Sequence, residues 1–339
     1  MFSMTLAMAL LLGLLVCAIP HIIFAIWCVV AVLFRLHTPS YAPFGWTALV
    51  LVLACWLVMA YGFFWGRFRL WVNHTDYTDS EIPTAFDGYK IVHISDLHLS
   101  TFDDRPEALQ RVADSINAQQ PDLICFTGDL VTMGVEEAKP YVHILSRLRA
   151  TDGVVSVLGN HDLLIYSRFS EQQRLAEVER LAAFERDTLH WQLLRNQNLM
   201  ITRSAKDAPL AQTITILGVD NSSCDGQGFR TIYSGDLSQA FQATEGFRIL
   251  LSHDPTQWEA EIIDRTPISL TLSGHTHAGQ VRLLGHPLSD LMFRESAGWY
   301  RHGAQSLYVN EGVGCTVPIR INCPSEITVI TLHCATAQN

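Results

Sequence analysis

The stretch "YKIVHISDLHLS", residues 89–100, decides the fold, because in it a short apolar run ends in acidic and imidazole side chains. The run "IVHI" has the length and the β-branched character of a buried strand. Asp96 and His98 follow at the point where such a strand would end. In open α/β sheets, ligands bind beyond the carboxyl ends of the strands. The stretch therefore predicts a strand that delivers two ligand side chains to a binding site.

The pattern of an apolar run followed by a polar turn recurs four times further along the chain. The polar turns carry Asp129, Asn160 with His161, His253, and His275 with His277. Glycines flank the last pair, and glycine lets backbone crowd around a small bound object. Because strand ends meet at one edge of a sheet, we expect these distant residues to converge.

The alternation of strands and helices predicts an α/β fold. Helical patterns at residues 105–120, 136–150 and 170–196 separate or follow the first three strands, and βαβ units imply parallel pairing. Further strands are expected at residues 213–220, 247–255, 268–277, 307–314 and 326–332. This later cluster predicts a second sheet packed on the first. The expected architecture is a two-sheet sandwich flanked by helices.

Two long apolar segments precede this domain. Up to Gly66 the only Asp, Glu, Lys or Arg is Arg35, and residues 1–34 and 41–66 each exceed the roughly 20 apolar residues that a membrane span needs. A signal peptide or a buried core hairpin would be the alternatives, but no basic start or clear cleavage site is present. We expect two transmembrane helices, the first a single helix kinked at Pro20.

The domain organisation follows from these patterns. Residues 1–72 are predicted to form a membrane anchor, the polar and turn-rich residues 73–87 a linker, and residues 88–339 the catalytic domain. The chain has a net charge of −10, and the acidic soluble part argues against binding to nucleic acid, which uses basic patches. Positive charge at Arg67 and Arg69 places that domain in the cytoplasm by the positive-inside rule.

The cysteines agree with a reducing compartment. Three lie in the apolar segments, and the five in the remaining chain show no C-x-x-C spacing, so neither a disulfide framework nor a zinc knuckle is predicted. The five are Cys125, Cys224, Cys315, Cys323 and Cys334.

The residues at the strand ends have the chemistry of a metal site. Carboxylate, amide oxygen and imidazole suit Mn, Fe or Zn, and the absence of cysteine from the strand ends argues against a soft thiolate site. Two Asp, one Asn and four His are too many ligands for one ion and suit two divalent ions. Mn is the expected metal, with Fe or Zn as alternatives.

In order along the chain, the blocks "DLH", "GDLV", "GNHD", "LSHDP" and "GHTH" resemble the pattern of the calcineurin-like metallophosphoesterases. The resemblance covers about residues 88–333. The sequences "GHTHAGQ" and "PIRINCPSEITVITL" are most similar to a membrane-anchored bacterial branch of that family. The resemblance implies a metallophosphoesterase sandwich and a metal-dependent phosphoric ester hydrolase located in the bacterial inner membrane.

The resemblance also implies roles for individual residues. One metal would be held by Asp96, His98, Asp129 and His277, and the other by Asp129, Asn160, His253 and His275, with Asp129 as the bridge. His161 would not bind metal but would donate a proton or a hydrogen bond to the substrate phosphate. By analogy with other carboxylates near metal sites, Asp162 would orient His161.

The substrate is left open by the metal ligands, because specificity belongs to the walls of the cleft. The short distance along the chain from the second apolar segment to the first catalytic strand favours a phosphate ester or pyrophosphate on a membrane lipid. The resemblance points to a UDP-acylated glucosamine. A non-catalytic scaffold of the same fold, and a nuclease or phosphodiesterase acting on a soluble substrate, are the alternatives.

Some residues have no assigned place in this pattern. Asp220 and Asn221 follow a strand end and are candidates to line the cleft. Six histidines fit no block and are expected to have structural or surface roles: His93, His143, His190, His286, His302 and His333.

Overall fold

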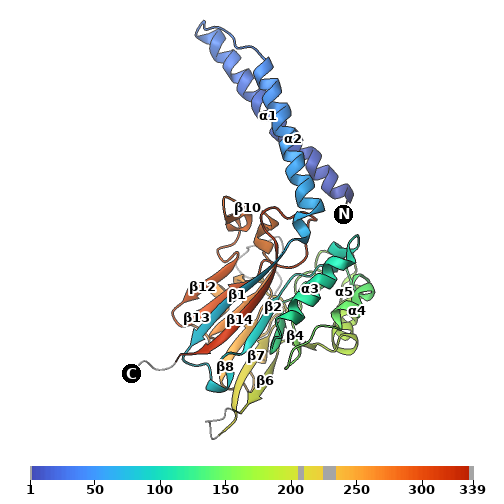
Figure 1. Ribbon diagram of the computed structural model, residues 1–339, viewed down its shortest axis with the longest axis vertical. Helices are drawn as coiled ribbons and strands as arrows, with labels where there is room; N and C mark the ends of the chain where they lie inside the picture. The colour runs from blue at the N-terminus through green and yellow to red at the C-terminus, as the bar shows by residue number, and fades with distance from the viewer. Residues whose placement is uncertain (1, 205–209, 224–233, 336–339) are drawn as a thin grey trace. The chain divides into compact units, whose positions relative to one another are not determined.

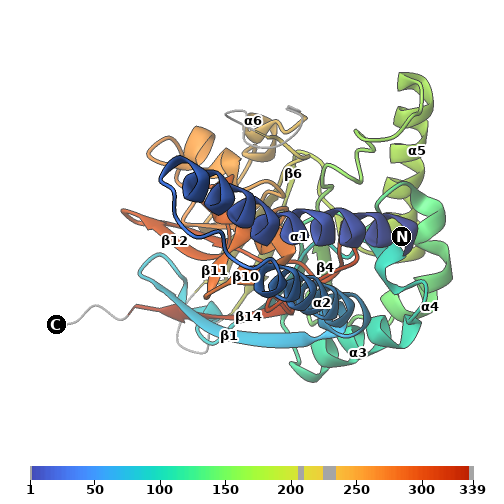
Figure 2. The ribbon, with the colours of Figure 1, turned by 90° about the horizontal axis from the view of Figure 1, so that it is seen from above.

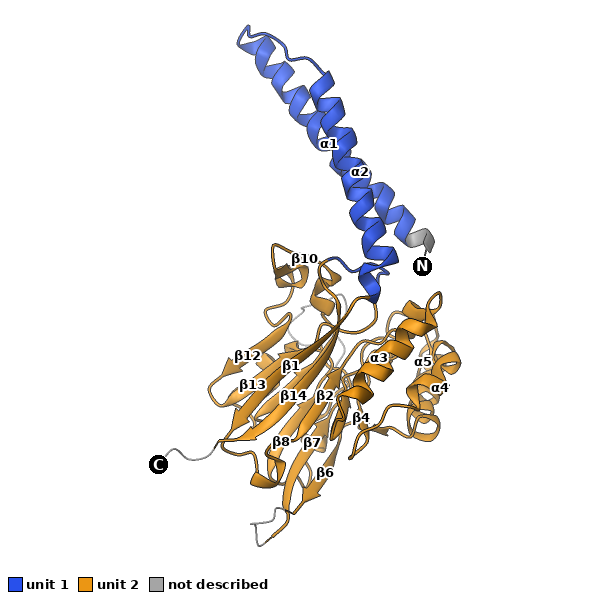
Figure 3. Cartoon of the chain, in the orientation of Figure 1, with its two compact units in different colours: residues 1–68, 317–321 blue, residues 69–316, 322–339 orange. Residues whose placement is uncertain are grey.

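The computed structural model describes residues 2–204, 210–223 and 234–335, so that Cys224 lies outside the described residues. The chain divides into two compact units (Figure 3). Unit 1 comprises residues 1–68 and 317–321, and unit 2 comprises residues 69–316 and 322–339. The boundary after Phe68 lies four residues before the expected end of the anchor.

Unit 1 is a helical hairpin whose two long helices lie side by side (Figure 1). Helix α1 spans Phe2–Leu33 and continues through Pro20 as the single helix that was predicted. Helix α2 spans Ala42–Phe64 and is followed by a 3₁₀ turn at Gly66–Phe68. The indole Nε1 of Trp56 donates to the carbonyl of Ala9 at 3.0 Å. Thr5–Leu33 and Ala42–Phe68 are long and apolar enough to cross a membrane.

The first sheet of unit 2 contains the strands that come early in the catalytic domain. Its order is β1-β14-β2-β3-β4-β5, with β2 through β5 parallel and β14 antiparallel to β2. The strands are β1 Leu70–Asp79, β2 Lys90–Ile94, β3 Leu123–Phe126, β4 Val154–Ser156, β5 Gln192–Leu193 and β14 Ser325–Cys334. The parallel βαβ start is confirmed.

The second sheet contains the later strands, in the order β12-β13-β9-β8-β7-β6. Strands β7, β8, β9 and β13 are parallel, and β6 and β12 close the two edges in antiparallel orientation. The strands are β6 Gln197–Arg203, β7 Gln212–Gly218, β8 Phe247–Leu251, β9 Leu270–Ser273, β12 Gly298–His302 and β13 Gln305–Val309. A small separate hairpin pairs β10 Arg282–Leu283 with β11 His286–Pro287.

The two sheets enclose one apolar core. Ile91 and Val155 from the first sheet are fully buried in the same cluster as Ile216, Ile249 and Leu272 from the second. Helices α3 Pro106–Ala118, α4 Val142–Leu145 and α5 Glu171–Ala183 gather at one side of the unit, while α6 Leu237–Ala240 lies elsewhere (Figure 2). The predicted α/β sandwich of two sheets with outer helices is confirmed.

The linker predicted over residues 73–87 is wrong for its first half. Residues 70–79 form β1, which pairs in parallel with β14 along ten residues from Leu70–Ser325 to Asp79–Cys334. As an edge strand, β1 turns many polar side chains toward solvent, and this composition resembles that of a loop. Its partner lies about 255 positions away in the sequence, so local pattern could not reveal the pairing.

The helix predicted at residues 136–150 is also wrong in most of its length. Two 3₁₀ turns at Val135–Glu137 and Lys139–Tyr141 precede the single turn of α4. Pro140 lacks a backbone N–H and its ring crowds the preceding turn, which disfavours a continuous α-helix here, and two 3₁₀ turns form instead. The helix expected at residues 170–196 ends sooner, with α5 passing into a π-helical turn at Phe184–Thr188.

Candidate metal centre

The predicted ligand residues converge at the carboxyl ends of the strands in unit 2. Asp96 and His98 follow β2, Asp129 follows β3, His253 follows β8, and His275 follows β9. Of these five residues and His277, all are buried except His275, which is half-buried. Such residue types usually lie at the solvent-exposed surface. The turns are also bonded to one another, since the Asp96 N–H donates to the Gly128 carbonyl at 2.8 Å.

The backbone at these turns is unusual. Positive φ values occur at the non-glycine residues Asp96, His98, Asp129, His275 and His277. Such conformations are strained for residues with a side chain and cluster at functional sites, where surrounding structure holds them in place. Here they turn each side chain back toward a common centre.

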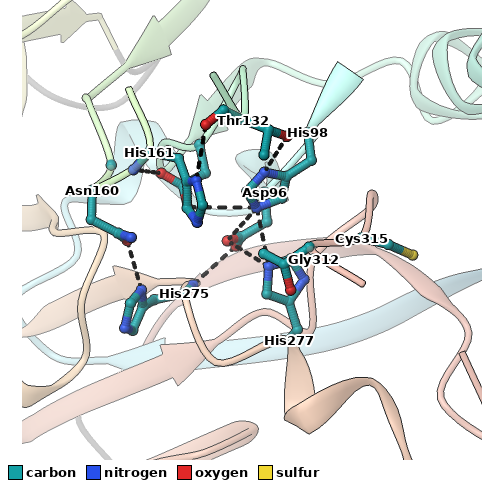
Figure 4. A network of polar contacts seen from close by, with 12 residues as sticks. Asp96, His98, Thr132, Asn160, His161, His275, His277, Gly312 and Cys315 are labelled. Atoms are coloured by element: carbon teal, nitrogen blue, oxygen red, sulfur yellow. Dashed lines mark hydrogen bonds and ion pairs between the residues drawn. The ribbon is translucent and has the colours of Figure 1, made fainter. Parts of the chain in front are cut away.

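One group of side chains contains Asp96, His98 and His277, which could hold a metal ion together. The Nε2 atoms of the two imidazoles lie 3.2 Å apart, and His277 Nε2 lies 3.2 Å from Asp96 Oδ1 (Figure 4). The other ring nitrogen of His98, Nδ1, contacts the Thr132 hydroxyl at 3.2 Å. His98 therefore presents Nε2 to the centre of this group.

A second group contains Asp129, Asn160, His253 and His275. The amide Oδ1 of Asn160 lies 2.9 Å from His253 Nε2 and 2.8 Å from His275 Nδ1. Asp129 Oδ2 lies 3.2 Å from His253 Nε2 and 3.5 Å from His98 Nε2. Asp129 thus stands between the two groups, as a bridging carboxylate would.

Two glycines allow the turns to approach this closely. A Cβ atom at Gly159 would lie 2.2 Å from Asp129 Oδ1, and one at Gly274 would lie 1.9 Å from Ser95 Oγ and 2.4 Å from Asp96 Oδ2. All three distances are far below any real carbon contact. The glycines in "GNHD" and "GHTH" are therefore required by the packing of the centre.

The electrostatics of the centre favour a cation. Burial alone would raise the pKa of Asp129, but the neighbouring His253, His161 and His98 lower it well below its usual range. Burial alone would lower the pKa of His253, but the Asp129 carboxylate outweighs burial and raises that pKa to about 10. Cation binding would displace the His253 proton, because metal ligation requires a neutral imidazole.

The residues present fit a divalent metal site. Asp96 Oδ1 is buried and makes no hydrogen bond of acceptable geometry, which is costly for a carboxylate oxygen unless a cation faces it. His253 donates from Nδ1 to the Thr127 carbonyl at 2.7 Å, which leaves Nε2 as the free lone pair in the neutral ring. Oxygen and imidazole donors of this kind suit Mn, Fe or Zn.

His161 lies beside the two groups without joining either. Its Nδ1 lies 3.1 Å from the Thr132 carbonyl oxygen, and its ring centre lies 4.9 Å from those of His98 and Tyr166. A carbonyl can only accept, so Nδ1 carries the hydrogen and Nε2 is the atom available for proton exchange. His161 is half-buried, whereas His98 and His253 are buried completely.

Asp162 contacts backbone and not the His161 ring. Its Oδ2 accepts from the Asp129 N–H at 2.6 Å and from the Gly159 N–H at 3.0 Å, and its Oδ1 accepts from the Val131 N–H at 3.1 Å. The expectation that Asp162 orients His161 is therefore corrected: the Thr132 carbonyl holds that ring. Asp162 instead braces the turn that carries Asp129.

Asp254 is a site residue that sequence reasoning missed. Its Oδ2 lies 3.6 Å from His275 Nε2 and accepts from the Ser223 hydroxyl at 2.6 Å. Its Oδ1 accepts from the N–H and the hydroxyl of Thr256 at 2.9 and 2.7 Å. Its position directly after His253 in "LSHDP" was the available signal.

Asp220 does not belong to the ligand cluster. Arg195 donates from Nη2 to Asp220 Oδ2 at 2.9 Å, which gives the carboxylate a structural partner. Asn221 is buried and donates weakly to the Ser223 hydroxyl at 3.4 Å, and the same hydroxyl donates to Asp254, which links Asn221 to the centre within the described residues.

The remaining histidines divide between the core and the surface. His93 is fully buried beside the Thr127 hydroxyl at 2.9 Å, and burial lowers its pKa to about 3, so the ring is neutral. His302 and His333 lie at the surface near Asp264 and Asp76, at 3.0 and 3.4 Å.

Comparison with known proteins connects this geometry to a family. Residues 89–279 match the family described as calcineurin-like phosphoesterase. The metallophosphoesterase YkuE of Bacillus subtilis (strain 168) is 33% identical over 273 residues, covering 77% of this chain and 85% of that protein. The phosphodiesterase YaeI of Escherichia coli (strain K12) is 26% identical over 252 residues, covering 72% of this chain and 82% of that protein.

A third relative is named as a transmembrane protein. The transmembrane protein with metallophosphoesterase domain of Danio rerio is 31% identical over 263 residues, covering 74% of this chain and 55% of that protein. Together with the two apolar helices of unit 1, this match is consistent with membrane association.

Proposed function

The chain belongs to the calcineurin-like phosphoesterase family and is a metal-dependent phosphoester hydrolase, and from that premise we propose that it is a membrane-anchored dinuclear enzyme. The family uses a dinuclear site for divalent metals, and the candidate ligand groups are present in this chain. The observation that carries the proposal is the position of Asp129 between two groups of donors.

The ligand assignment follows the two groups. Asp96, His98, Asp129 and His277 would hold one ion, and Asp129, Asn160, His253 and His275 would hold the other, with Mn as the expected metal. When bound, two divalent ions activate a water molecule and neutralise charge on the phosphoryl oxygens. The buried turns hold the donor side chains in place. Asp162 fixes the backbone that carries Asp129, and Asp254 lies beside the His275 ring.

His161 is the residue that handles a proton. The Thr132 carbonyl fixes its Nδ1–H, and the half-buried ring can donate from Nε2 when protonated. It stabilises charge on the phosphoryl or the leaving oxygen as the ester bond breaks. Its exclusion from both ligand groups supports this role.

The substrate is a phosphate ester or pyrophosphate carried by a membrane lipid, such as a UDP-acylated glucosamine. The second candidate span ends at Phe68 and β1 begins at Leu70. Even a fully extended chain covers at most about 3.5 Å per residue, so the start of β1 must lie close to the end of the span. The exposed side chains of Met133, Tyr166 and Phe169 follow the turns that carry Asp129 and His161, and they would suit acyl chains. The E. coli relative named a phosphodiesterase favours a diester or pyrophosphate bond.

We also propose that the protein resides in a bacterial inner membrane with the catalytic unit in the cytoplasm. Arg67 and Arg69 at the end of the second span support this orientation.

A direct comparison of substrates tests the proposal. The full chain, solubilised in detergent and supplied with Mn, is assayed on a lipid-linked pyrophosphate in mixed micelles and on its deacylated analogue. A higher kcat/KM for the acylated form supports the lipid substrate. Equal values, with the anchor present, contradict the lipid substrate and leave the hydrolase assignment intact. A chain that binds two ions but hydrolyses no ester in a broad panel would instead be a scaffold.

A further inference from the structure

Unit 2 exposes a group of large aliphatic side chains in one short segment, residues 282–292, which we call the apolar hairpin. Leu283, Leu284 and Leu291 are 69%, 92% and 82% exposed, and Leu288 and Met292 are about half-exposed. Single exposed leucines are normal on a protein surface, but five such residues within ten positions are not. We therefore expect these side chains to contact a binding partner.

The apolar hairpin has a defined backbone conformation that strand pairing and the side chain of Arg282 hold in place. Strands β10 and β11 are joined by a two-residue turn in which Leu284 and Gly285 both have positive φ, at 52° and 90°. Such turns prefer Asn-Gly, so a leucine here is unfavourable for the backbone. Arg282 ties the turn down by donating to the Gly285 carbonyl at 2.9 Å and by pairing with Glu311. Leu284 is 92% exposed, and residues with a strained backbone cluster at functional sites.

The apolar hairpin lies at the same end of unit 2 as the metal centre. The 3₁₀ turn His277–Gln280 leads directly into β10, and the Phe293 ring lies edge-on to His275 with centres 5.6 Å apart. Figure 1 shows β10 at one end of the strands and β6 extending to the other.

The chain enters unit 2 at this same end. Leu70, the first residue of β1, is in register with Ser325, whose hydroxyl donates to the Val313 carbonyl at 2.6 Å. The next N–H, of Gly314, donates to the Asp96 carbonyl at 2.7 Å. Leu70, two positions after the second candidate span, is thus connected, in three contacts, to a proposed metal ligand. If α2 crosses a bilayer, chain length alone keeps this end of unit 2 near the lipid surface.

We propose that the apolar hairpin inserts its leucines into the same bilayer that α1 and α2 cross, and so presents the metal centre to the lipid surface. The inference rests on the membrane anchoring in the proposed function. A stable protein interface draws on roughly 20–30 residues per partner, whereas the apolar hairpin offers five apolar side chains on a convex turn. Exposed aliphatic side chains of this kind suit the boundary of headgroups and acyl chains.

Photocrosslinking of the full chain in lipid nanodiscs tests this contact. A benzophenone amino acid replaces Leu284 in the apolar hairpin, Leu14 in α1, or Leu210 as the matched control. Leu14 and Leu210 are 69% and 78% exposed, comparable with Leu284. Leu210 precedes β7, whose opposite end leads toward the metal centre, so it lies at the far end of unit 2. Hydrolysis of a soluble phosphate ester checks that each variant is folded.

The expected result is lipid adducts at Leu284 and Leu14, detected by mass spectrometry, with adducts at Leu210 lower by about tenfold or more. Adducts at Leu14 but only the Leu210 level at Leu284 would overturn the proposed contact and leave the anchor standing. A missing adduct at Leu14 would overturn the membrane anchoring on which the inference rests. Crosslinks from Leu284 to a second copy of the chain would also overturn it, in favour of self-association.

Discussion

Asp254 offers the sharpest test of the metal centre, because it acts on a ligand without being one. Replacing Asp254→Asn keeps the size of the side chain and one acceptor oxygen. If that oxygen stays toward Thr256, the new NH₂ group faces His275 Nε2, where a carboxylate oxygen now lies 3.6 Å away. A carboxylate favours hydrogen on Nε2 and leaves Nδ1 free for the metal, whereas an NH₂ group favours the opposite tautomer.

The expected loss of metal affinity can be estimated from the distance between Asp254 Oδ2 and His275 Nε2. Removing a partner of a metal-bound histidine typically costs about 10–100-fold in metal affinity. The separation of 3.6 Å is longer than an ordinary hydrogen bond, so we expect the lower end, about tenfold. Tenfold corresponds to about 1.4 kcal/mol. The loss should fall on one of the two metals, since the His275 ring contacts Asn160 and His253 of the second group.

The assay is a competition for Mn or Zn against a chromophoric chelator, with metal content measured separately. Asp264→Asn is the matched control, because it also removes a carboxylate from a histidine, His302, but at the exposed surface. The reasoning is refuted if Asp254→Asn binds both metals as tightly as the parent chain. It is equally refuted if Asp264→Asn shows the same loss.

Four further predictions concern the centre and the anchor. Asp129→Asn should reduce the metal content to one ion or none and abolish turnover; full content and activity would remove Asp129 from its bridging place. His161→Ala should lower kcat by about 10²–10⁴-fold with both metals retained, and loss of metal would make it a ligand. Removing metal with a chelator should lower Tm by about 5–10 °C, since free metal at about 100 times Kd stabilises by about 2.7 kcal/mol; an unchanged Tm would contradict a metal-stabilised fold. A reporter fused after Asn339 should be active only in the cytoplasm, and activity outside it would reverse the orientation.

The prediction of the fold succeeded where buried strands carry their own signal. The runs that became β2, β3, β8 and β9 are short, apolar and followed by polar turns, because these strands are covered on both faces. The prediction failed for β1, whose polar face resembles a loop, and for residues 136–150, where Pro140 breaks a helical pattern. Edge strands and interrupted helices depend on what packs beside them, so their local sequence is ambiguous.

The sequence by itself determined the identities of the candidate ligands and the family. Each ligand directly follows an apolar run, and strand ends meet at one edge for geometric reasons that hold for any such sheet. Only the tertiary structure decided how the ligands are held: that Asp162 braces backbone, that Thr132 holds His161, and that Asp254 faces His275. It also decided that the apolar hairpin and the start of β1 share the end of the unit that contains the centre. These relations join residues far apart in the sequence, and their geometry depends on how the two sheets pack, which no local pattern encodes.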